Sequence, residues 1–269
     1  MKTKLFIIVA FVSLLLSSCS NSKDSNKKVK DKNDVITIGC MALNVEAVEE
    51  IKTLMERDGY KIEVKVFDGN NLPAMALSAN EIDGLILNHK PWIDTFNKAN
   101  NSDLVLVDGF KYASLNGLYS SKYNTVDEIP SNATITISND PSNMDRGLRF
   151  LDKLGLIKLG QKSGEFYGIL DIIDNPKNIN FLEVEITSTA GAYKDADATI
   201  TSSSIMKNAG YDANSYIVED GEYINFPIGL VVNRGNENSQ WAKDLAKVTQ
   251  TEEYRKRFDE IFQGAFIII

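Results

Sequence analysis

Residues 133–157, "ATITISNDPSNMDRGLRFLDKLGLI", contain the pattern that decides the fold. Alternating apolar residues before Ser138 predict a strand, and apolar residues at helical spacing after Pro141 predict a helix. A short polar turn joins the two. Arg146 then falls near the start of the helix, where a cation is unfavourable unless an anion lies nearby. The stretch therefore predicts a strand–turn–helix unit with an anion close to Arg146.

The rest of the chain repeats this alternation. The other predicted strands are residues 35–39, 61–67, 84–88, 179–186, 197–201 and 226–233. The other predicted helices are residues 47–55, 71–83, 189–195, 203–211, 239–249 and 251–262, the last with Thr251 as its N-cap. Strands separated by helices, without tight hairpins, predict βαβ units, mainly parallel sheets and an α/β fold. A chain of 269 residues is long enough for two such domains.

The N-terminus has the pattern of a bacterial lipoprotein precursor. Two lysines precede an apolar run at residues 5–16, and Leu-Ser-Ser-Cys at residues 16–19 resembles a lipobox. We expect residues 1–18 to be a signal peptide and Cys19 to carry the lipid. Residues 19–34 then form the lipidated start and a polar, flexible tether. The alternative, a buried first helix, does not fit the polar stretch that follows.

Charge excludes one class of partner. From residue 35 onwards the chain has 34 acidic and 22 basic residues, a net charge of −12. So acidic a body argues against nucleic acid as a partner. The tether is basic and could lie against an anionic lipid surface.

Cysteine and histidine are scarce. If Cys19 carries lipid, Cys40 has no partner, so we expect neither a disulfide framework nor a cysteine metal site. Cys40 is expected to be a small buried residue at a strand end. A nucleophilic role is the alternative, but the chain has one histidine to activate it. We predict no metal, no cofactor and no catalytic residue.

Over residues 35–269 the chain resembles the methionine-binding lipoproteins of bacterial ABC importers, the NlpA or MetQ-like family. Residues 76–98, 116–159 and 171–185 carry this resemblance. The family's Asn-Asp-Pro-x-Asn-x-x-Arg block is complete at residues 139–146. So long a block, in order and correctly spaced, is a specific signal.

The resemblance implies a two-lobed, type II periplasmic-binding-protein-like fold, a Venus flytrap with a cleft between the lobes. The chain would cross near Leu118 and return near Gly229, so that lobe 1 is residues 35–118 plus 230–269 and lobe 2 is residues 119–229. It also implies a monomer, lipid-anchored on the extracytoplasmic face of the cell membrane. Its partners would be an ABC permease and a small ligand: L- or D-methionine, another amino acid, a derivative or a short peptide.

The resemblance also implies roles for four residues. Arg146 would receive the carboxylate of an amino acid, to which a guanidinium can bind in bidentate fashion beside a helix N-terminus. The alternative is a solvated Arg146 paired with Asp145 or another local acid. His89 would lie in the cleft after a strand, Trp92 would be core or a pocket wall, and Asn143 would be an N-cap or a donor to the ligand.

Several family contact positions are changed. The corresponding or nearby residues here are Asn70, Leu87, Ser202, Ser204, Asn225 and Gly229, and the early Pro-His pair is Asn44-Val45. Most of these changes remove aromatic surface or an amide donor, and polar pockets discriminate strongly by such groups. We therefore expect the carboxylate anchor to remain, with the side-chain pocket and the ammonium site rebuilt.

Two other function classes stay open from the sequence. One is an enzyme on the same scaffold, for which one histidine and one free cysteine leave little machinery. The other is a surface interaction or adhesin-like lipoprotein that kept the fold and lost transport. Binding of a small molecule distinguishes the solute-binding hypothesis from the adhesin-like alternative.

Overall fold

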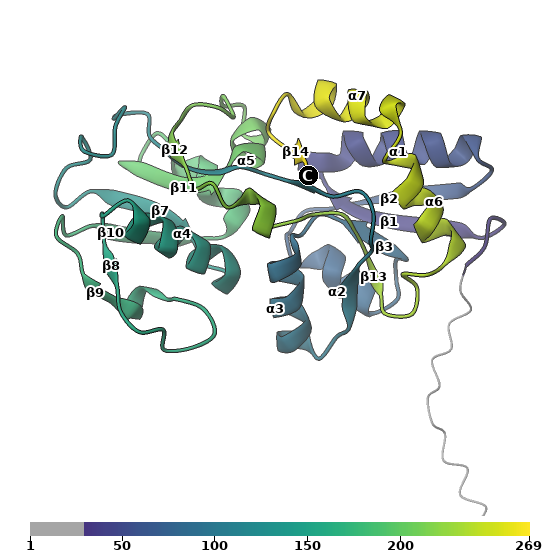
Figure 1. Cartoon of the computed structure of the whole chain (residues 1–269), viewed down its shortest axis with the longest axis horizontal. Coiled ribbons are helices and arrows are strands. Elements are labelled where there is room, and N and C mark those ends of the chain that lie inside the picture. The colour runs from purple at the N-terminus through teal and green to yellow at the C-terminus, as the bar shows by residue number, and fades with distance from the viewer. Residues whose placement is uncertain (1–29) are drawn as a thin grey trace, which may run out of the picture.

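The computed structural model describes residues 30–269 as two α/β lobes lying side by side (Figure 1). Lobe 1 is built around the first five-stranded sheet and lobe 2 around the second. The predicted two-lobed α/β fold is confirmed. The predicted signal peptide, Cys19 and the first part of the tether lie outside the described residues.

The secondary structure elements follow the predicted alternation. Lobe 1 contains β1 (Val35–Met41), η1 (Ala42–Asn44), α1 (Val45–Arg57), β2 (Lys61–Phe67), α2 (Leu72–Ser78), β3 (Gly84–Ile86), α3 (Lys90–Asn100), β4 (Leu104–Leu106), β13 (Leu230–Asn233), α6 (Gln240–Val248) and α7 (Glu252–Phe262). Lobe 2 contains β6 (Asn116–Tyr119), β7 (Thr134–Ser138), α4 (Pro141–Lys153), β8 (Lys158–Leu159), η2 (Ile169–Asp171), β9 (Ile172–Asp174), β10 (Asn180–Val184), η3 (Ile186–Ala192), β11 (Ala198–Ser202), α5 (Ser203–Asn208), β12 (Tyr216–Glu219) and η4 (Tyr223–Asn225). A small sheet of β5 (Tyr112–Ala113) and β14 (Ile267–Ile268) lies beside one crossing between the lobes.

The two large sheets have the same plan. Their strand orders are β2-β1-β3-β13-β4 and β10-β7-β11-β6-β12. In each, the first three strands are parallel and the fourth is antiparallel to both neighbours. Four of the five strands in each sheet thus run in one direction, so the sheets are mainly parallel as predicted, with one reversed strand, β13 or β6, in each. The reason is that β6 and β13 each follow a crossing between the lobes, so they start at the cleft edge where the parallel strands end.

The crossings also bear on where the lobes divide. Because β6 starts at Asn116, the second sheet begins inside the segment 35–118 that the sequence assigned to lobe 1. The return lies before β13, which starts at Leu230. The division into residues 35–118 plus 230–269 and 119–229 stays a prediction.

Helical periodicity identified the face of α1 that packs on the core. Its buried residues are Ala47, Val48, Ile51, Leu54 and Met55, the five residues whose spacing predicted the helix. Thr251 caps α7 as predicted, since its side chain accepts a hydrogen bond from the Tyr254 N–H. The helix predicted near residues 189–195 is instead the 3₁₀ segment η3.

Each lobe has its own buried apolar core, which fixes the sheet edges that face the other lobe.

Two predictions near the N-terminus have different outcomes. Cys40 is fully buried in β1 as predicted, and burial raises the pKa of its thiol to about 12. The end of the predicted flexible tether, however, contacts the body. Lys30 forms an ion pair with Asp83 at 2.6 Å, and the Lys32 ammonium lies 4.7 Å from the centre of the Tyr60 ring. These charged contacts hold residues 30–34 on lobe 1.

Among residues 30–269, no helix combines the length and apolar character that crossing a membrane requires.

Candidate functional site

The facing edges of the two sheets bring together residues from distant parts of the chain. In lobe 1, residues 87–89 follow β3 and Asn70 follows β2. In lobe 2, α4 follows β7, Ser202 ends β11, and Asn116 starts the antiparallel β6. Ligands of open α/β sheets bind beyond the carboxyl ends of the strands, so this is the expected place for a site.

A cavity of about 80 Å³ lies between these edges. One water needs about 10–15 Å³ on this scale, so the cavity has room for about five to eight water-sized groups. Its walls are Leu43, Asn70, Leu87, Asn88, His89, Trp92, Ser114, Asn116, Asn143, Arg146, Ile186, Thr187, Ser202, Ser204, Ile205, Phe226, Ile228 and Phe266. Among these described residues Arg146 alone carries a full charge at neutral pH. The cavity thus suits a small, largely apolar molecule that carries an anionic group.

The Arg146 guanidinium already has an anion within the protein. Its Nε and Nη2 atoms donate to the two carboxylate oxygens of Asp220 at 2.5 and 3.0 Å. Both side chains are buried, at 5 % and 2 % exposure. The Phe226 ring covers one face of the guanidinium, 3.9 Å from its central carbon. The anion indicated by the sequence is therefore an internal carboxylate, 74 residues away along the chain.

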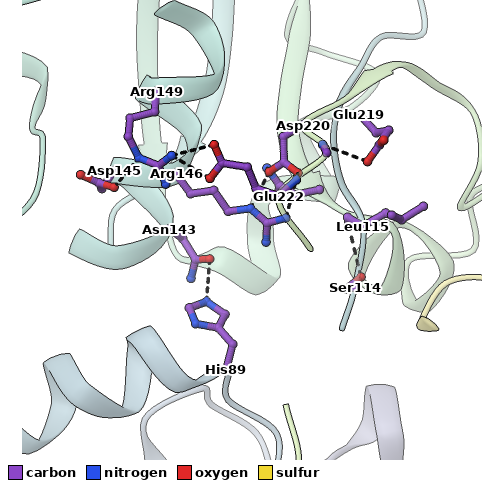
Figure 2. A network of polar contacts seen from close by, with 12 residues as sticks. His89, Ser114, Leu115, Asn143, Asp145, Arg146, Arg149, Glu219, Asp220 and Glu222 are labelled. Carbon is purple, nitrogen blue, oxygen red and sulfur yellow. Dashed lines mark hydrogen bonds and ion pairs between the residues drawn. The ribbon is translucent and has the colours of Figure 1, made fainter. Parts of the chain in front are cut away.

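The same carboxylate accepts two further hydrogen bonds. Asp220 Oδ1 accepts the Glu222 N–H at 2.9 Å, and Asp220 Oδ2 accepts the Asn116 amide N–H at 3.4 Å. Figure 2 shows Arg146 reaching from α4 to Asp220, which follows β12. A guanidinium has five N–H groups, and Asp220 takes those on its Nε–Nη2 side. Among the described residues the Nη1 atom has no hydrogen-bond partner, so Arg146 has donors left for a second anion.

The alternative in which Arg146 is solvated and paired with Asp145 is wrong. Asp145 accepts hydrogen bonds from Arg149 Nε at 2.8 Å, Lys162 Nζ at 3.0 Å and the Tyr167 N–H at 2.9 Å. Although its burial works against ionisation, these three donors lower the pKa of the Asp145 carboxyl. Asp145 therefore holds the loop at residues 160–168 against α4.

His89 connects the two lobes. Its Nδ1 accepts the Trp92 N–H at 3.1 Å as the N-cap of α3, so the ring proton lies on Nε2. His89 Nε2 then donates to Asn143 Oδ1 in lobe 2 at 3.0 Å (Figure 2). Burial lowers the pKa of His89 to about 4, so the ring is neutral at pH 7. An ion pair between Lys98 of α3 and Glu165 of lobe 2 gives a second contact across the cleft.

The structure brings most of the predicted site residues to the cavity. Those that line it are Asn70, Leu87, His89, Trp92, Asn143, Arg146, Ser202 and Ser204. Trp92 is both core and wall, since it is buried and stacked on Phe96. Asn143 is not the N-cap of α4. That position is Asp140, whose side chain accepts the Asn143 N–H at 3.0 Å.

Two predicted residues lie elsewhere. Asn225 is exposed on η4, and the next residue, Phe226, turns inward to line the cavity. Gly229 has already entered lobe 1, where a Cβ at this position would lie 2.9 Å from the Phe110 carbonyl oxygen. Neither Asn225 nor Gly229 lines the cavity, because the chain leaves the cleft just before β13.

Three residues at the site were not predicted from the sequence: Asp220, Asn116 and Phe226. Asp220 follows the strand β12, and Asn116 starts the strand β6, neither of which the analysis had assigned. A polar residue at a strand end facing the cleft is the signal that could have identified both. Phe226 has no such signal, because it is one of several apolar residues between Tyr223 and Val232.

The donors at the site are amides, hydroxyls, one imidazole and one guanidinium. Within residues 30–269, no group of three or more histidine, cysteine, aspartate or glutamate side chains is arranged to hold a metal ion. Neutral amides and hydroxyls orient polar ligands by hydrogen bonds, so the arrangement fits binding of a small molecule.

Comparison with known proteins agrees with this geometry. The profile of one protein family, described as NlpA lipoprotein, matches residues 36–269. The chain is 30% identical to a Haemophilus influenzae protein named "Probable D-methionine-binding lipoprotein MetQ", covering 99% of both chains. It is also 30% identical to Lipoprotein 28 of Escherichia coli, covering 94% of this chain and 92% of that one. The structure of a nutrient binding protein from Burkholderia cenocepacia bound to methionine matches with a TM-score of 0.81 and 25% identity, covering 87% of this chain and 99% of that chain.

Proposed function

The chain belongs to the NlpA lipoprotein family, and on this premise we propose that it is the membrane-anchored solute-binding protein of an ABC importer. It binds one amino acid, methionine or a related one, between its lobes and delivers it to the permease. The observation that carries this proposal is the cleft cavity with Arg146 as its one charged wall. The proposal includes no catalytic role.

The ligand's α-carboxylate binds Arg146. Asp220 occupies the Nε–Nη2 side of the guanidinium, which leaves the Nη1–Nη2 side for a second carboxylate. The loop and N-terminus of α4 add a favourable dipole for an anion. Because Asp220 already balances the charge of Arg146, a zwitterion brings no net charge into the closed cleft. A neutral amino acid is therefore favoured over a ligand with an additional charge.

The rest of the cavity supports an apolar side chain on the ligand. Leu87 and Trp92 from lobe 1 and Ile205 and Phe226 from lobe 2 are among its walls. The cavity volume of about 80 Å³ has room for a small molecule and not for a long peptide. Methionine is also the ligand in the related Burkholderia cenocepacia structure.

Closure of the lobes follows from the contacts across the cleft. The His89–Asn143 hydrogen bond and the Lys98–Glu165 ion pair each join the two lobes. A ligand that touches both lobes shifts a hinge equilibrium towards the closed state.

The test is ligand-dependent thermal stabilisation of residues 20–269, unfolded and refolded to remove carried-over ligand. The panel is the twenty common amino acids, D-methionine and short methionine peptides. At 100 times Kd, a ligand adds about 2.7 kcal/mol to the free energy of unfolding. Arg146→Met combined with Asp220→Leu, which leaves no unpaired buried charge, should abolish the shift while the protein still folds. No shift with any compound refutes the proposal.

Mass spectrometry of the native protein complements this test. A released amino acid supports the proposal and names the ligand. An empty cleft, together with no thermal shift, points to the alternative of an interaction or adhesin-like lipoprotein.

The membrane anchor has its own test. We propose that Cys19 carries the lipid and that the body is attached on the extracytoplasmic side. In cells, Cys19→Ser should move the protein from the membrane fraction to the soluble fraction. Retention of the variant in the membrane would refute lipidation at this residue.

A further inference from the structure

We propose that Asn116, oriented by Asp220, accepts the α-ammonium group of the bound amino acid. This inference rests on the proposed function, since it assigns the second half of the ligand's zwitterion. Asn116 is 8 % exposed and lines the cavity. It lies outside the positions at which the sequence suggested a ligand contact.

Asp220 determines which way the Asn116 amide points. A carboxylate only accepts hydrogen bonds, so the amide nitrogen of Asn116 must face Asp220 Oδ2, 3.4 Å away. The amide oxygen then points in the opposite direction. Among the described residues this Oδ1 atom has no hydrogen-bond partner, although the side chain is nine-tenths buried. Because it is not one of the fully buried unpaired polar atoms, this oxygen is accessible from the cavity that Asn116 lines, where a ligand donor can reach it.

The backbone holds Asn116 firmly in this position. As the first residue of β6, it pairs with Ser202 of β11, and its carbonyl oxygen accepts the Asp220 N–H at 2.9 Å. Two neighbouring strands therefore fix it. Groups placed by strands are held more precisely than groups on loops.

Asp220 also places this acceptor beside the carboxylate anchor. Its Oδ2 atom accepts from both Arg146 Nε, at 2.5 Å, and Asn116 Nδ2, at 3.4 Å. The two side chains are therefore neighbours around one oxygen atom. In an α-amino acid, the carboxylate and the ammonium are separated by a single carbon. Both side chains bind the same carboxylate, which leaves the Nη1 atom of Arg146 for the ligand's carboxylate and the Oδ1 atom of Asn116 for its ammonium.

Ser202 supplies a second acceptor on the same face. Directly paired residues of antiparallel strands place their side chains on one side of the sheet, so Ser202 lies beside Asn116. The Ser202 and Ser204 hydroxyl oxygens are 3.0 Å apart, and both residues line the cavity. An ammonium group has three N–H donors and can use the Asn116 amide oxygen together with the Ser202 hydroxyl.

Asn88 is the competing acceptor. Its Oδ1 is buried without a partner, and its amide nitrogen donates to Asn70 Oδ1 at 2.9 Å. Asn88 follows β3 in lobe 1, whereas Arg146 is in lobe 2. A ligand whose carboxylate is on Arg146 has its ammonium one carbon away. Lobe 2, and hence Asn116, is therefore the favoured source of the acceptor.

The experiment compares methionine with 4-(methylthio)butanoate, which has the same carboxylate and side chain but no amino group. Isothermal titration measures both affinities for wild type, Asn116→Leu and the matched control Asn88→Leu. A hydrogen bond from a charged group predicts that wild type prefers methionine by about 10- to 100-fold. In Asn116→Leu this preference should fall to within about 3-fold of unity, with 4-(methylthio)butanoate binding retained.

Each outcome decides the assignment. Retained 4-(methylthio)butanoate binding in Asn116→Leu shows that the fold and the Arg146 anchor are intact. An unchanged preference in Asn116→Leu, or a preference lost only in Asn88→Leu, overturns the assignment while leaving the proposed function standing. If the panel above selects another amino acid, that amino acid and its des-amino acid replace the two probes. If wild type binds no amino acid, the proposed function and this assignment fail together.

Discussion

Replacing Asp220 with Asn should destabilise the protein far more than the matched change at Glu222. The two acids each bind an arginine of α4 through two oxygens, but they differ in burial. Arg146 and Asp220 are 5 % and 2 % exposed, whereas Arg149 and Glu222 are both 32 % exposed. Arg149 also donates to a second carboxylate, Asp145, at 2.8 Å. Comparison of Asp220→Asn with Glu222→Gln therefore contrasts a buried arginine that loses its carboxylate with a half-exposed arginine that keeps one.

The magnitudes follow from the two environments. Removing one member of a buried ion pair leaves an uncompensated charge, which costs about 3–5 kcal/mol. Removing one member of a half-exposed pair costs about 0–1 kcal/mol, because water solvates the remaining charge. Asp220→Asn should thus lower the free energy of unfolding by about 3–5 kcal/mol. Glu222→Gln should lower it by less than about 1 kcal/mol.

Urea denaturation at pH 7, followed by tryptophan fluorescence, measures both changes with wild type as reference. The m-value should stay constant if the variants unfold in the same two-state manner. A third variant, Arg146→Met with Asp220→Leu, removes both charges. It should recover most of the lost stability, since apolar replacement of a buried pair is often neutral or favourable. It should also lose ligand binding.

Two results would refute this reasoning. Equal losses for Asp220→Asn and Glu222→Gln would mean that burial does not set the cost of the unpaired arginine. A double variant as unstable as Asp220→Asn would mean that the pair itself stabilises the fold. The expected pattern instead identifies the pair as a feature kept for binding.

Three further predictions concern other parts of the structure. His89 is the one histidine in the sequence, and its folded pKa of about 4 lies below the unfolded value of about 6.5. The unfolded state therefore binds the proton more readily. The free energy of unfolding of wild type should fall by at most about 3 kcal/mol as the pH drops from 6.5 to 4, and this fall should be absent in His89→Gln. Urea titrations across this range measure the difference, and parallel pH profiles would contradict it. The Lys98–Glu165 pair is exposed, so Lys98→Met should speed ligand release by less than about fivefold in stopped-flow measurements at low salt. Lys98→Met should have no effect on the release rate when it is made in Glu165→Gln or measured at 1 M salt. The buried Cys40 thiol should react with Ellman's reagent only at the rate of unfolding, and fast labelling of the native protein would contradict its burial.

The sequence predicted local structure well because each signal there is local. The apolar spacing of α1, the Thr251 cap and the strand–turn–helix unit around Arg146 each depend on residues within one or two turns. The lobe architecture followed from alternation of strands and helices. The direction of β6 and β13 did not, because it depends on where the chain crosses between the lobes.

The site was predicted only in part for the same reason. Residues that follow a recognised strand, such as His89 and Ser202, were placed correctly. The partner of Arg146 was not, since no local pattern connects it with a carboxylate 74 residues later. Nor could spacing show that Asn225 points outward while Phe226 points inward. Such contacts depend on the packing of one lobe against the other.

The placement of these groups suggests how the protein would select its ligand. In the proposed complex, Arg146 and Asn116 bind the carboxylate and ammonium that all α-amino acids share, and both belong to lobe 2. The apolar walls for the ligand's side chain include Leu87 and Trp92 of lobe 1 as well as Ile205 and Phe226 of lobe 2, so the side chain meets lobe 1 only when the lobes close. A ligand shifts the hinge equilibrium only by the contacts that the closed state adds. Many amino acids could therefore dock on lobe 2, but one whose side chain fits lobe 1 would favour closure, so closure rather than docking determines which amino acid is delivered.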